Sequence, residues 1–320
     1  MFIYAVRRFN LFIITLLILT LVGYNLLRLD PISPWAQQSF WSGWAMYVTE
    51  LTHLNFGVAK NGEPIVSQLA MVFPATLELC VIAFLFSLFI GIPLGTIAGM
   101  KQGKWVDTVI KFISMSGYSA PIFWVALMMI MVFSLHYQFF PVSGRYDLLY
   151  DVKRVTGFSL IDAFLASGEF RNYALQSVIE HMILPCLVLA ISPTTQVITL
   201  MRTSVSEVMS QNYIRAARIK GLSNFEIVTQ HVLRNAIPPI VPKFGVQLSS
   251  MLTLAIVTES IFDWPGIGRW LLDALSSQDY VSIQAGVIVI GALVLTAIIL
   301  SDLIGAIVNP LVRKEWYANK

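Results

Sequence analysis

The stretch YIRAARIKGLSNFEIVTQHVLRNAIPP, residues 213–239, interrupts a chain that is otherwise strongly apolar. It lies between two apolar runs, residues 181–201 and 242–262, each with about the 20 residues that a helix needs to cross a bilayer. A helix surrounded by lipid would not tolerate the basic residues of this stretch. The stretch is therefore expected to lie outside the bilayer and to separate two membrane helices.

The order of residues in this stretch predicts two short helices joined by an elbow. Asn212 is placed to cap the first helix, and Gly221 stands where a left-handed residue would end it. Ser223 and Glu226 have the spacing of a capping box at the start of the second helix. The prolines at 238 and 239 stop that second helix. Four residues of the first helix recur at helical spacing, namely Tyr213, Ala216, Ala217 and Lys220.

Composition places the whole chain in a membrane. Of its 320 residues, 57% are hydrophobic and 12% are charged, and the mean hydropathy is +0.73, whereas soluble domains carry roughly 25% charged residues. The apolar runs are continuous, which favours helices over the alternating strands of a barrel. We therefore predict an all-α integral membrane protein. Six windows are long enough to span the bilayer, at approximately 9–28, 72–99, 108–135, 181–201, 242–262 and 284–308.

The positions of the basic residues predict that both termini are cytoplasmic, because Lys and Arg are retained on that side during insertion. With the N-terminus inside, the inside segments hold fourteen Lys and Arg residues and the outside segments seven, which together make the chain's 21. Residues 202–241 then face the cytoplasm, where ATP is available. This topology accounts for the net charge of +3, so no nucleic-acid partner is expected.

Several other functions lack the residues that they require. Cys80 and Cys186 fall inside predicted spans, which implies no disulfide framework, and the four histidines show no close metal-ligand spacing. The sequence has no phosphate-binding loop, no G-x-S-x-G elbow and no H-E-x-x-H helix. We therefore expect neither enzymatic activity nor a cofactor or metal bound by this chain. The run after Arg7 and Arg8 lacks a small-x-small cleavage site and is expected to be a span, not a cleaved signal.

Two carboxylates, Glu78 and Glu259, fall within or near the ends of predicted spans. A charged group is costly in lipid, so each is a candidate for the substrate pathway. The alternative is solvation at the membrane interface or hydrogen bonding between helices.

Two further patterns concern packing. Small residues at 91, 95 and 99 recur every four positions, which favours close contact between helices over a gating hinge. An amphipathic element at the outer interface is predicted by the aromatic residues Trp35, Trp41, Trp44 and Tyr47.

The stretch at 213–239 resembles the EAA loop of bacterial ABC importer permeases, in which Glu-Ala-Ala is followed by three residues and Gly. Arg215 stands in place of that Glu. This departure matches the dipeptide and oligopeptide branch, with its pattern Tyr-x-Arg-x-Ala-x-x-Lys-Gly-Leu. In that family the loop docks the ATPase subunit. The resemblance implies that coupling to the ATPase depends on Tyr213, Arg215, Ala216, Ala217, Lys220, Gly221, His231 and Pro238.

Other segments are similar to the same branch. Residues 74–79 read PATLEL and residues 259–268 read ESIFDWPGIG, which resemble its P-A-T-L-E-L and E-x-x-F-x-W-P-G-x-G motifs. Within the branch, the outer segment at 138–181 with GRYDLLYDVK at 144–153, and the ending KEWY at 314–317, resemble Sap-type permeases. Those permeases are associated with antimicrobial peptides.

The resemblance implies a type I ABC importer permease in the bacterial inner membrane, importing cationic antimicrobial peptides that a periplasmic binding protein delivers. Its implied partners are a second homologous permease subunit and two cytoplasmic ABC ATPases, which bind ATP and Mg. Putrescine export by a similar complex is the alternative. The implied domains are a first helix with a periplasmic segment at 1–71, a permease core at 72–309 with the coupling loop 202–241, and a cytoplasmic tail at 310–320.

Two rivals from other classes remain open on the residues alone. An ATP-independent channel would make the 213–239 loop dispensable and would purify without an ATPase. An intramembrane enzyme would show turnover by this chain alone and would depend on acids such as Glu78 or Glu259.

Overall fold

The computed structural model describes residues 2–30, 33–150, 152–168 and 170–308. Within these ranges every named element is a helix, and the strand-like pairing is limited to an isolated bridge between Val58 and Pro64. The all-α prediction is therefore confirmed. The predicted tail at 310–320 and the KEWY ending lie outside the described residues, and the division into domains stays a prediction.

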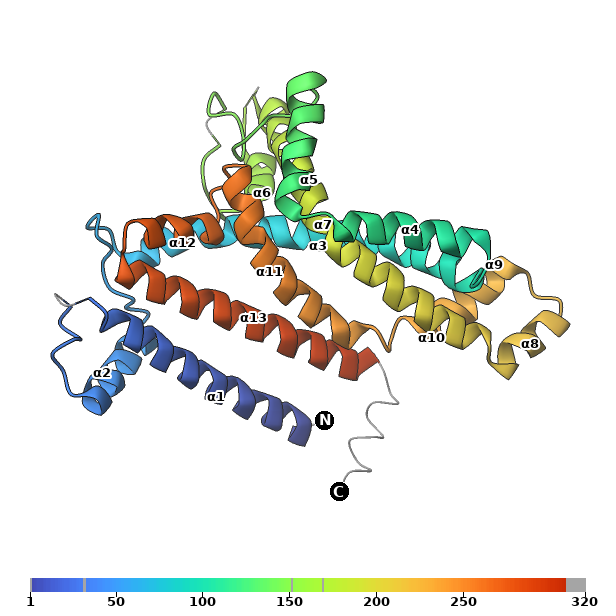
Figure 1. Cartoon of the computed structure of the whole chain (residues 1–320), viewed down its shortest axis with the longest axis horizontal. Helices are drawn as coiled ribbons and strands as arrows, with labels where there is room; N and C mark the ends of the chain where they lie inside the picture. The colour runs from blue at the N-terminus through green and yellow to red at the C-terminus, as the bar shows by residue number, and fades with distance from the viewer. Residues whose placement is uncertain (1, 31–32, 151, 169, 309–320) are drawn as a thin grey trace.

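Five helices are long and apolar enough to cross a membrane. Two of them extend well beyond the windows predicted at 72–99 and 181–201, because hydropathy marks only the lipid-buried part of a helix that continues with polar residues. The five are α1 (Phe2–Leu27), α3 (Ile65–Met100), α7 (Arg171–Met209), α11 (Phe244–Ile261) preceded by the 3-10 helix η3 (Val241–Lys243), and α13 (Tyr280–Val308). Of these, α1, α3 and α13 run along the long axis of the molecule (Figure 1).

The third predicted span, 108–135, is not one straight helix. It consists of α4 (Trp105–Ser119), followed by α5 (Ile122–Met129) and the π-helix η1 (Ile130–His136), and the two parts are bent by 97°. Ala120 is extended, with φ −75° and ψ 135°, because a residue before proline avoids the helical region, and Pro121 has no N–H with which to continue the helix. The prediction of six spans therefore requires this bent pair to count as one.

Small residues let α3 and α7 pack closely. A Cβ atom added to Gly91 would lie 2.6 Å from Cγ1 of Val197, and one added to Gly95 would lie 2.6 Å from Cβ of Met201. At Gly99 the added atom would lie 2.7 Å from the backbone oxygen of Arg202. The predicted close contact of helices along these three glycines is confirmed.

Three shorter helices lie toward the predicted outer side: α2 (Phe40–Thr52), α6 (Ser159–Leu165) and α12 (Ile267–Ser276). α2 is the predicted aromatic element. The Tyr47 ring lies 5.8 Å from the rings of both Tyr24 and Trp35, and its hydroxyl donates to the Gln284 side chain of α13. Burial raises the pKa of Tyr47 above its ordinary value, so this hydroxyl remains a donor at neutral pH.

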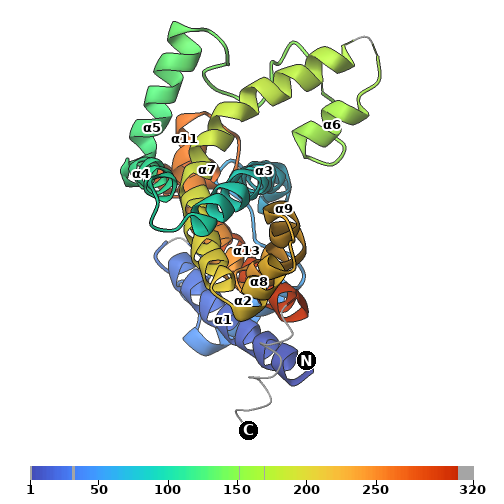
Figure 2. The same ribbon diagram turned by 90° about the vertical axis from the view of Figure 1, so that its right-hand side faces the viewer.

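The opposite end holds the connection between α7 and α11. It consists of α8 (Asn212–Ile219), α9 (Asn224–Glu226), the π-helix η2 (Ile227–Val232) and α10 (Leu233–Ala236). These short helices lie at the end of the molecule farthest from α2 and α12 (Figure 1), and α8 and α9 face the viewer in Figure 2. The predicted helix, elbow and helix of residues 213–239 is therefore present.

Candidate functional site: an exposed elbow and a membrane groove

The turn between α8 and α9 needs a glycine for its backbone conformation. Gly221 has φ +82°, in the left-handed region that residues with a Cβ rarely adopt. The N–H groups of Gly221 and Leu222 donate to the carbonyls of Arg218 and Ala217 at 3.0 and 3.3 Å and close the end of α8. No described atom lies within 4 Å of an added Cβ, so the requirement is conformational and not steric.

The capping box at the second helix is confirmed. The Ser223 hydroxyl accepts the N–H of Glu226 at 3.2 Å, and the Glu226 carboxylate accepts the N–H of Ser223 at 2.8 Å. The hydrogen bonds from the Ser223 hydroxyl and N–H lower the pKa of the Glu226 carboxyl below its ordinary value.

The predicted cap of the first helix is wrong. Gln211, and not Asn212, is the N-cap residue of α8, and its side chain makes no capping hydrogen bond. Since α7 ends at Met209, the short connection already turns at Gln211, which is extended with φ −70° and ψ 146°, and Asn212 becomes the first helical residue.

One face of the elbow packs on the chain's own spans, and the other face is exposed. Ile214 and Ala217 are buried in a cluster with residues of α7, η2 and α10. On the outer face, Ile219 is 87% exposed and Phe225 is 76% exposed. Apolar side chains that protrude beside basic ones are typical of a surface that binds another protein. The other buried members of the cluster are Val197, Met201, Val205, Val208, Ile227, Val232, Ala236 and Ile240.

The eight predicted coupling residues divide between these two faces. Ala217 is buried in the chain's own core, so only its neighbour Ala216 is free to admit another surface. His231 and Pro238 are half-buried. The role of all eight residues in docking an ATPase stays a prediction. The exposed members are Tyr213, Arg215, Ala216, Lys220 and Gly221.

Hydrogen bonds tie the elbow to the spans on both sides. The Ser204 hydroxyl of α7 donates to the carbonyl of Ala236 at 2.7 Å. The Ser301 hydroxyl of α13 donates to the carbonyl of Val241 at 2.7 Å and accepts the N–H of Gly245 at 2.9 Å. The elbow is thus bonded directly to α7, and the segment that follows it, η3 and the start of α11, is bonded to α13.

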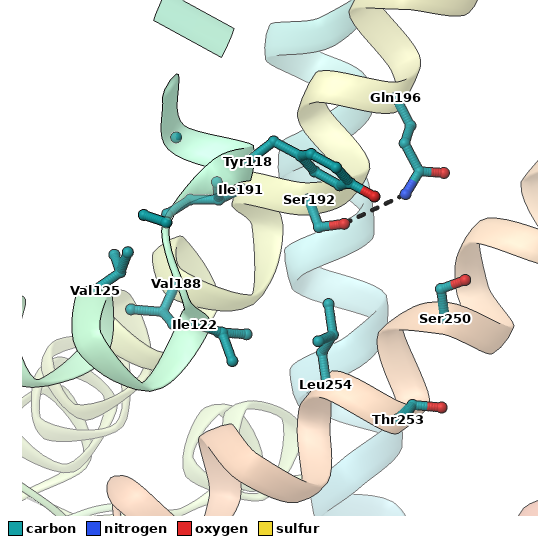
Figure 3. A pocket seen from close by; sticks show the side chains of 12 residues that line it. Tyr118, Ile122, Val125, Val188, Ile191, Ser192, Gln196, Ser250, Thr253 and Leu254 are labelled. Carbon is teal, nitrogen blue, oxygen red and sulfur yellow. Dashed lines mark hydrogen bonds between the residues drawn. The ribbon is translucent and has the colours of Figure 1, made fainter. Parts of the chain in front are cut away.

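Two adjacent chambers, of about 520 and 550 Å³, form a groove along α4, α5, α7 and α11, and they share the lining residues Tyr118 and Gln196. The outer chamber contains hydroxyl and amide groups from α7 and α11 (Figure 3). There Gln196 donates to the Ser192 hydroxyl at 3.3 Å. The outer chamber is lined by Gly117, Tyr118, Ala120, Ile122, Val125, Val188, Ile191, Ser192, Gln196, Ser250, Thr253 and Leu254.

The inner chamber lies toward the predicted cytoplasmic side and carries basic residues. Arg202 is held by Asp107, with Nε 2.5 Å from Oδ1 and a terminal nitrogen 2.7 Å from Oδ2. Among the described lining residues of both chambers there is no Asp or Glu. Besides Tyr118 and Gln196, the inner chamber is lined by Lys111, Ser114, Met115, Thr195, Ile198, Thr199, Leu200, Arg202, Lys243, Val246 and Gln247.

Neither of the two predicted pathway acids lines the groove. The Glu259 side chain is fully buried, and its carboxylate accepts the Thr76 hydroxyl at 2.5 Å and the N–H groups of Gly268 and Arg269 at 2.8 and 3.2 Å. It therefore closes the start of α12. Hydrogen bonding between helices, the alternative weighed from the sequence, is confirmed for this residue, and a role in the substrate path stays a prediction.

Glu78 is likewise occupied within the chain. Its carboxylate pairs with Arg145 at 2.5 Å and accepts the N–H groups of Ser159 and Leu160 at 3.0 and 2.7 Å. Arg145 also donates to the carbonyl of Gly157 at 2.8 Å. Glu78 thus fastens the outer segment to α3, which again confirms the hydrogen-bonding alternative.

Comparison with known proteins finds relatives that cover most of the chain. The peptide transport system permease protein SapB of Salmonella typhimurium is 49% identical over 319 residues, which are 99% of each chain. The SapB of Escherichia coli strain K12, named a putrescine export system permease protein, is 50% identical over the same coverage. The dipeptide transport system permease protein DppB of Escherichia coli strain K12 is 39% identical over 279 residues, or 86% of this chain and 81% of the relative.

A solved structure and a family model agree with these relatives. A chain of the MetNI methionine ABC transporter in inward-facing conformations matches with a TM-score of 0.54 and 15% identity, covering 73% of this chain and 93% of that chain. At this identity the match shows the fold alone, which is that of a type I ABC importer permease. The family model described as binding-protein-dependent transport system inner membrane component matches residues 91–314. This multi-pass inner-membrane chain therefore belongs to the family of binding-protein-dependent transport system inner membrane components.

Proposed function

We propose that this chain is the non-catalytic permease subunit of an ATP-driven peptide importer and that its elbow receives the movement of a partner ATPase. The observation that carries the proposal is the exposed face of the elbow, where Ile219 and Phe225 protrude beside Arg215 and Lys220. A surface with both apolar and basic side chains exposed fits a protein partner that presents apolar and acidic groups.

The proposed complex contains a second homologous permease, two cytoplasmic ATPases and a periplasmic binding protein. The family to which the chain belongs supports this composition. ATP and Mg would bind to the ATPases, since this sequence has no phosphate-binding loop. The chain itself would supply half of the pathway and the surface that couples it to hydrolysis.

The proposed mechanism is alternating access driven from the elbow. When the ATPases close, they would push on α8, whose buried face is packed against α7. The hydrogen bonds of Ser204 and Ser301 would pass that movement to the neighbouring spans. Because packed helices move as rigid bodies, the groove between α4, α7 and α11 would open to one side at a time.

The chemistry of the groove supports peptides as cargo. Amide and hydroxyl groups at Gln196, Ser250 and Thr253 can bind the peptide backbone whatever its side chains are. Relatives of this chain are named peptide and dipeptide permeases. The described lining holds no acid that would select cationic peptides, so the proposal is for peptides as a class.

Putrescine export is the second candidate, and the name of the Escherichia coli K12 relative is the observation that favours it. A diamine needs carboxylates or a cage of aromatic rings for recognition. The groove instead presents Lys111 and Lys243, which would repel a dication.

Transport by the reconstituted complex tests the proposal. Proteoliposomes would receive a labelled peptide with its binding protein, or labelled putrescine, with ATP or with a non-hydrolysable analogue. We expect the peptide to move inward with ATP and not with the non-hydrolysable analogue. If putrescine moved and peptide did not, the cargo would be putrescine and not peptide. Transport with the non-hydrolysable analogue would indicate a channel.

A further inference from the structure

Gln247 of α11 has hydrogen-bonding capacity that the described structure leaves unused. Its side chain is 2% exposed, and neither Oε1 nor Nε2 has a hydrogen-bond partner among the described residues. It lines the inner chamber of the groove. A carboxamide buried without partners is unfavourable, so this position calls for a ligand that offers both a donor and an acceptor. A peptide unit offers both.

Two lysines line the same chamber. Lys111 comes from α4, and Lys243 comes from the 3-10 helix that precedes α11. Both side chains are exposed, and neither forms an ion pair within 4 Å in the described part of the chain. The third basic residue, Arg202, is already neutralised by Asp107. Asp107 interacts with both Arg202 and Lys111, so together with Lys243 these groups leave a net positive charge beside a carboxamide that has no partner.

We propose that the inner chamber binds the C-terminal end of a peptide, with Gln247 hydrogen-bonded to the last peptide units and Lys111 and Lys243 paired with the terminal carboxylate. The inference rests on the proposed function, because it requires peptide cargo. It adds a direction: the carboxylate end leads toward the cytoplasm, and the rest of the peptide lies in the outer chamber beside Gln196 and Thr253.

The other walls of the chamber favour this ligand over a free anion. Met115, Ile198 and Val246 present apolar surface that suits the side chains of a peptide and gives an inorganic anion nothing to bind. A diamine would meet the lysines with charge of the same sign. Only a molecule with an anionic end, amide groups and apolar side chains uses all three features.

The test compares one labelled peptide as its free acid and as its C-terminal amide, in ATP-driven uptake by the reconstituted complex. We expect the wild-type chain to take up the free acid about fivefold better, the effect of one partly screened ion pair. The double variant Lys111→Gln and Lys243→Gln should lose this preference. Lys104→Gln, an exposed lysine outside the groove, is the matched control and should keep it.

Gln247→Leu provides a second measurement. It should reduce uptake of acid and amide by the same factor while thermal stability is retained, because it removes an unpaired buried amide. Equal uptake of acid and amide by the wild-type chain, a preference that survives the double lysine variant, or full activity of Gln247→Leu would each overturn the inference. If the wild-type complex moved putrescine in either direction but moved no peptide, the proposed function itself would be wrong.

Discussion

Single carboxylates organise the outer end of this molecule by closing the starts of helices. Glu259 accepts two N–H groups at the start of α12, and Glu78 accepts two at the start of α6. The first N–H groups of a helix have no partner within it and carry partial positive charge, so a buried anion is stabilised there. A Cβ at Gly266 would lie 2.2 Å from the Glu259 carboxylate, which explains the glycine of the W-P-G segment.

Replacing Glu259 by Ala should therefore destabilise the fold. The change leaves the Thr76 hydroxyl and the N–H groups of Gly268 and Arg269 buried without an acceptor, at about 1–3 kcal/mol for each unsatisfied group. Thermal unfolding in detergent should show a large fall in Tm. Asp263→Asn, which alters an exposed ion pair with Arg269, is the control and should change Tm little. Equal Tm values for the two variants would contradict this role of Glu259.

The capping box should make the elbow sensitive to acid. Since hydrogen bonds lower the pKa of Glu226 from its ordinary value of 4.5, its contribution to stability is fully present above that value and is lost as the pH falls through the lowered pKa. Glu226→Gln keeps an oxygen that accepts the Ser223 N–H but does not titrate. Hydrogen exchange of residues 223–232, taken as a ratio to Glu226→Gln at each pH, should show protection lost in acid. A ratio that does not change with pH would refute this.

At the scale of elements, the elbow shows what a sequence can predict and what it cannot. Glycine and capping-box signals are local, so Gly221 and Ser223 were placed correctly. Which face of α8 is buried depends on where α7 lies, and the local pattern of residues 213–239 does not show that. Hence the sequence assigns the same coupling role to Ala216 and Ala217, although Ala217 packs inward, and it does not single out Ile219 and Phe225. Their only signal was apolar character within a basic stretch.

Gly221→Val should uncouple transport from ATP hydrolysis while insertion into the membrane is retained. Valine in the left-handed region costs about 1–3 kcal/mol, so the elbow would adopt another conformation and α8 would be misdirected. Gly221→Asn is the matched control, because asparagine tolerates this conformation, and it should keep most of the activity. Peptide uptake and peptide-stimulated ATPase activity in proteoliposomes measure the effect. Normal coupling in Gly221→Val would contradict this account of the elbow.

For the whole molecule, hydropathy was sufficient to place six apolar windows but not to shape them. The 97° bend between α4 and α5 falls at a proline, but α3 and α7 each contain two prolines and are continuous helices, so a proline alone does not predict such a bend. The groove could not be predicted, because Gln196 and Gln247 lie on different helices and meet only after packing. Glu78 and Glu259 were recognised as unusual, but their partners are distant in sequence.

The predicted orientation of the chain determines from which side of the membrane a thiol reagent can label an introduced cysteine. Ile219→Cys, at a position that is 87% exposed, should react with an impermeant maleimide only when the reagent reaches the cytoplasmic face. Leu148→Cys, at a position that is 89% exposed, should react only from the periplasmic face. The native Cys80 and Cys186 are buried and should contribute little background. Labelling of Ile219→Cys from the periplasm would overturn the topology and the proposed coupling with it.

The break at Ala120 and Pro121 also has a consequence for hydration. The last carbonyls of α4 have no partner within that helix, and hydrocarbon cannot solvate them. Non-helical backbone at membrane depth is tolerated only inside protein or beside a hydrated cavity, and Ala120 itself lines the outer chamber. We therefore expect the outer chamber to be hydrated, so that a solute within it would exchange water for the polar groups of the lining.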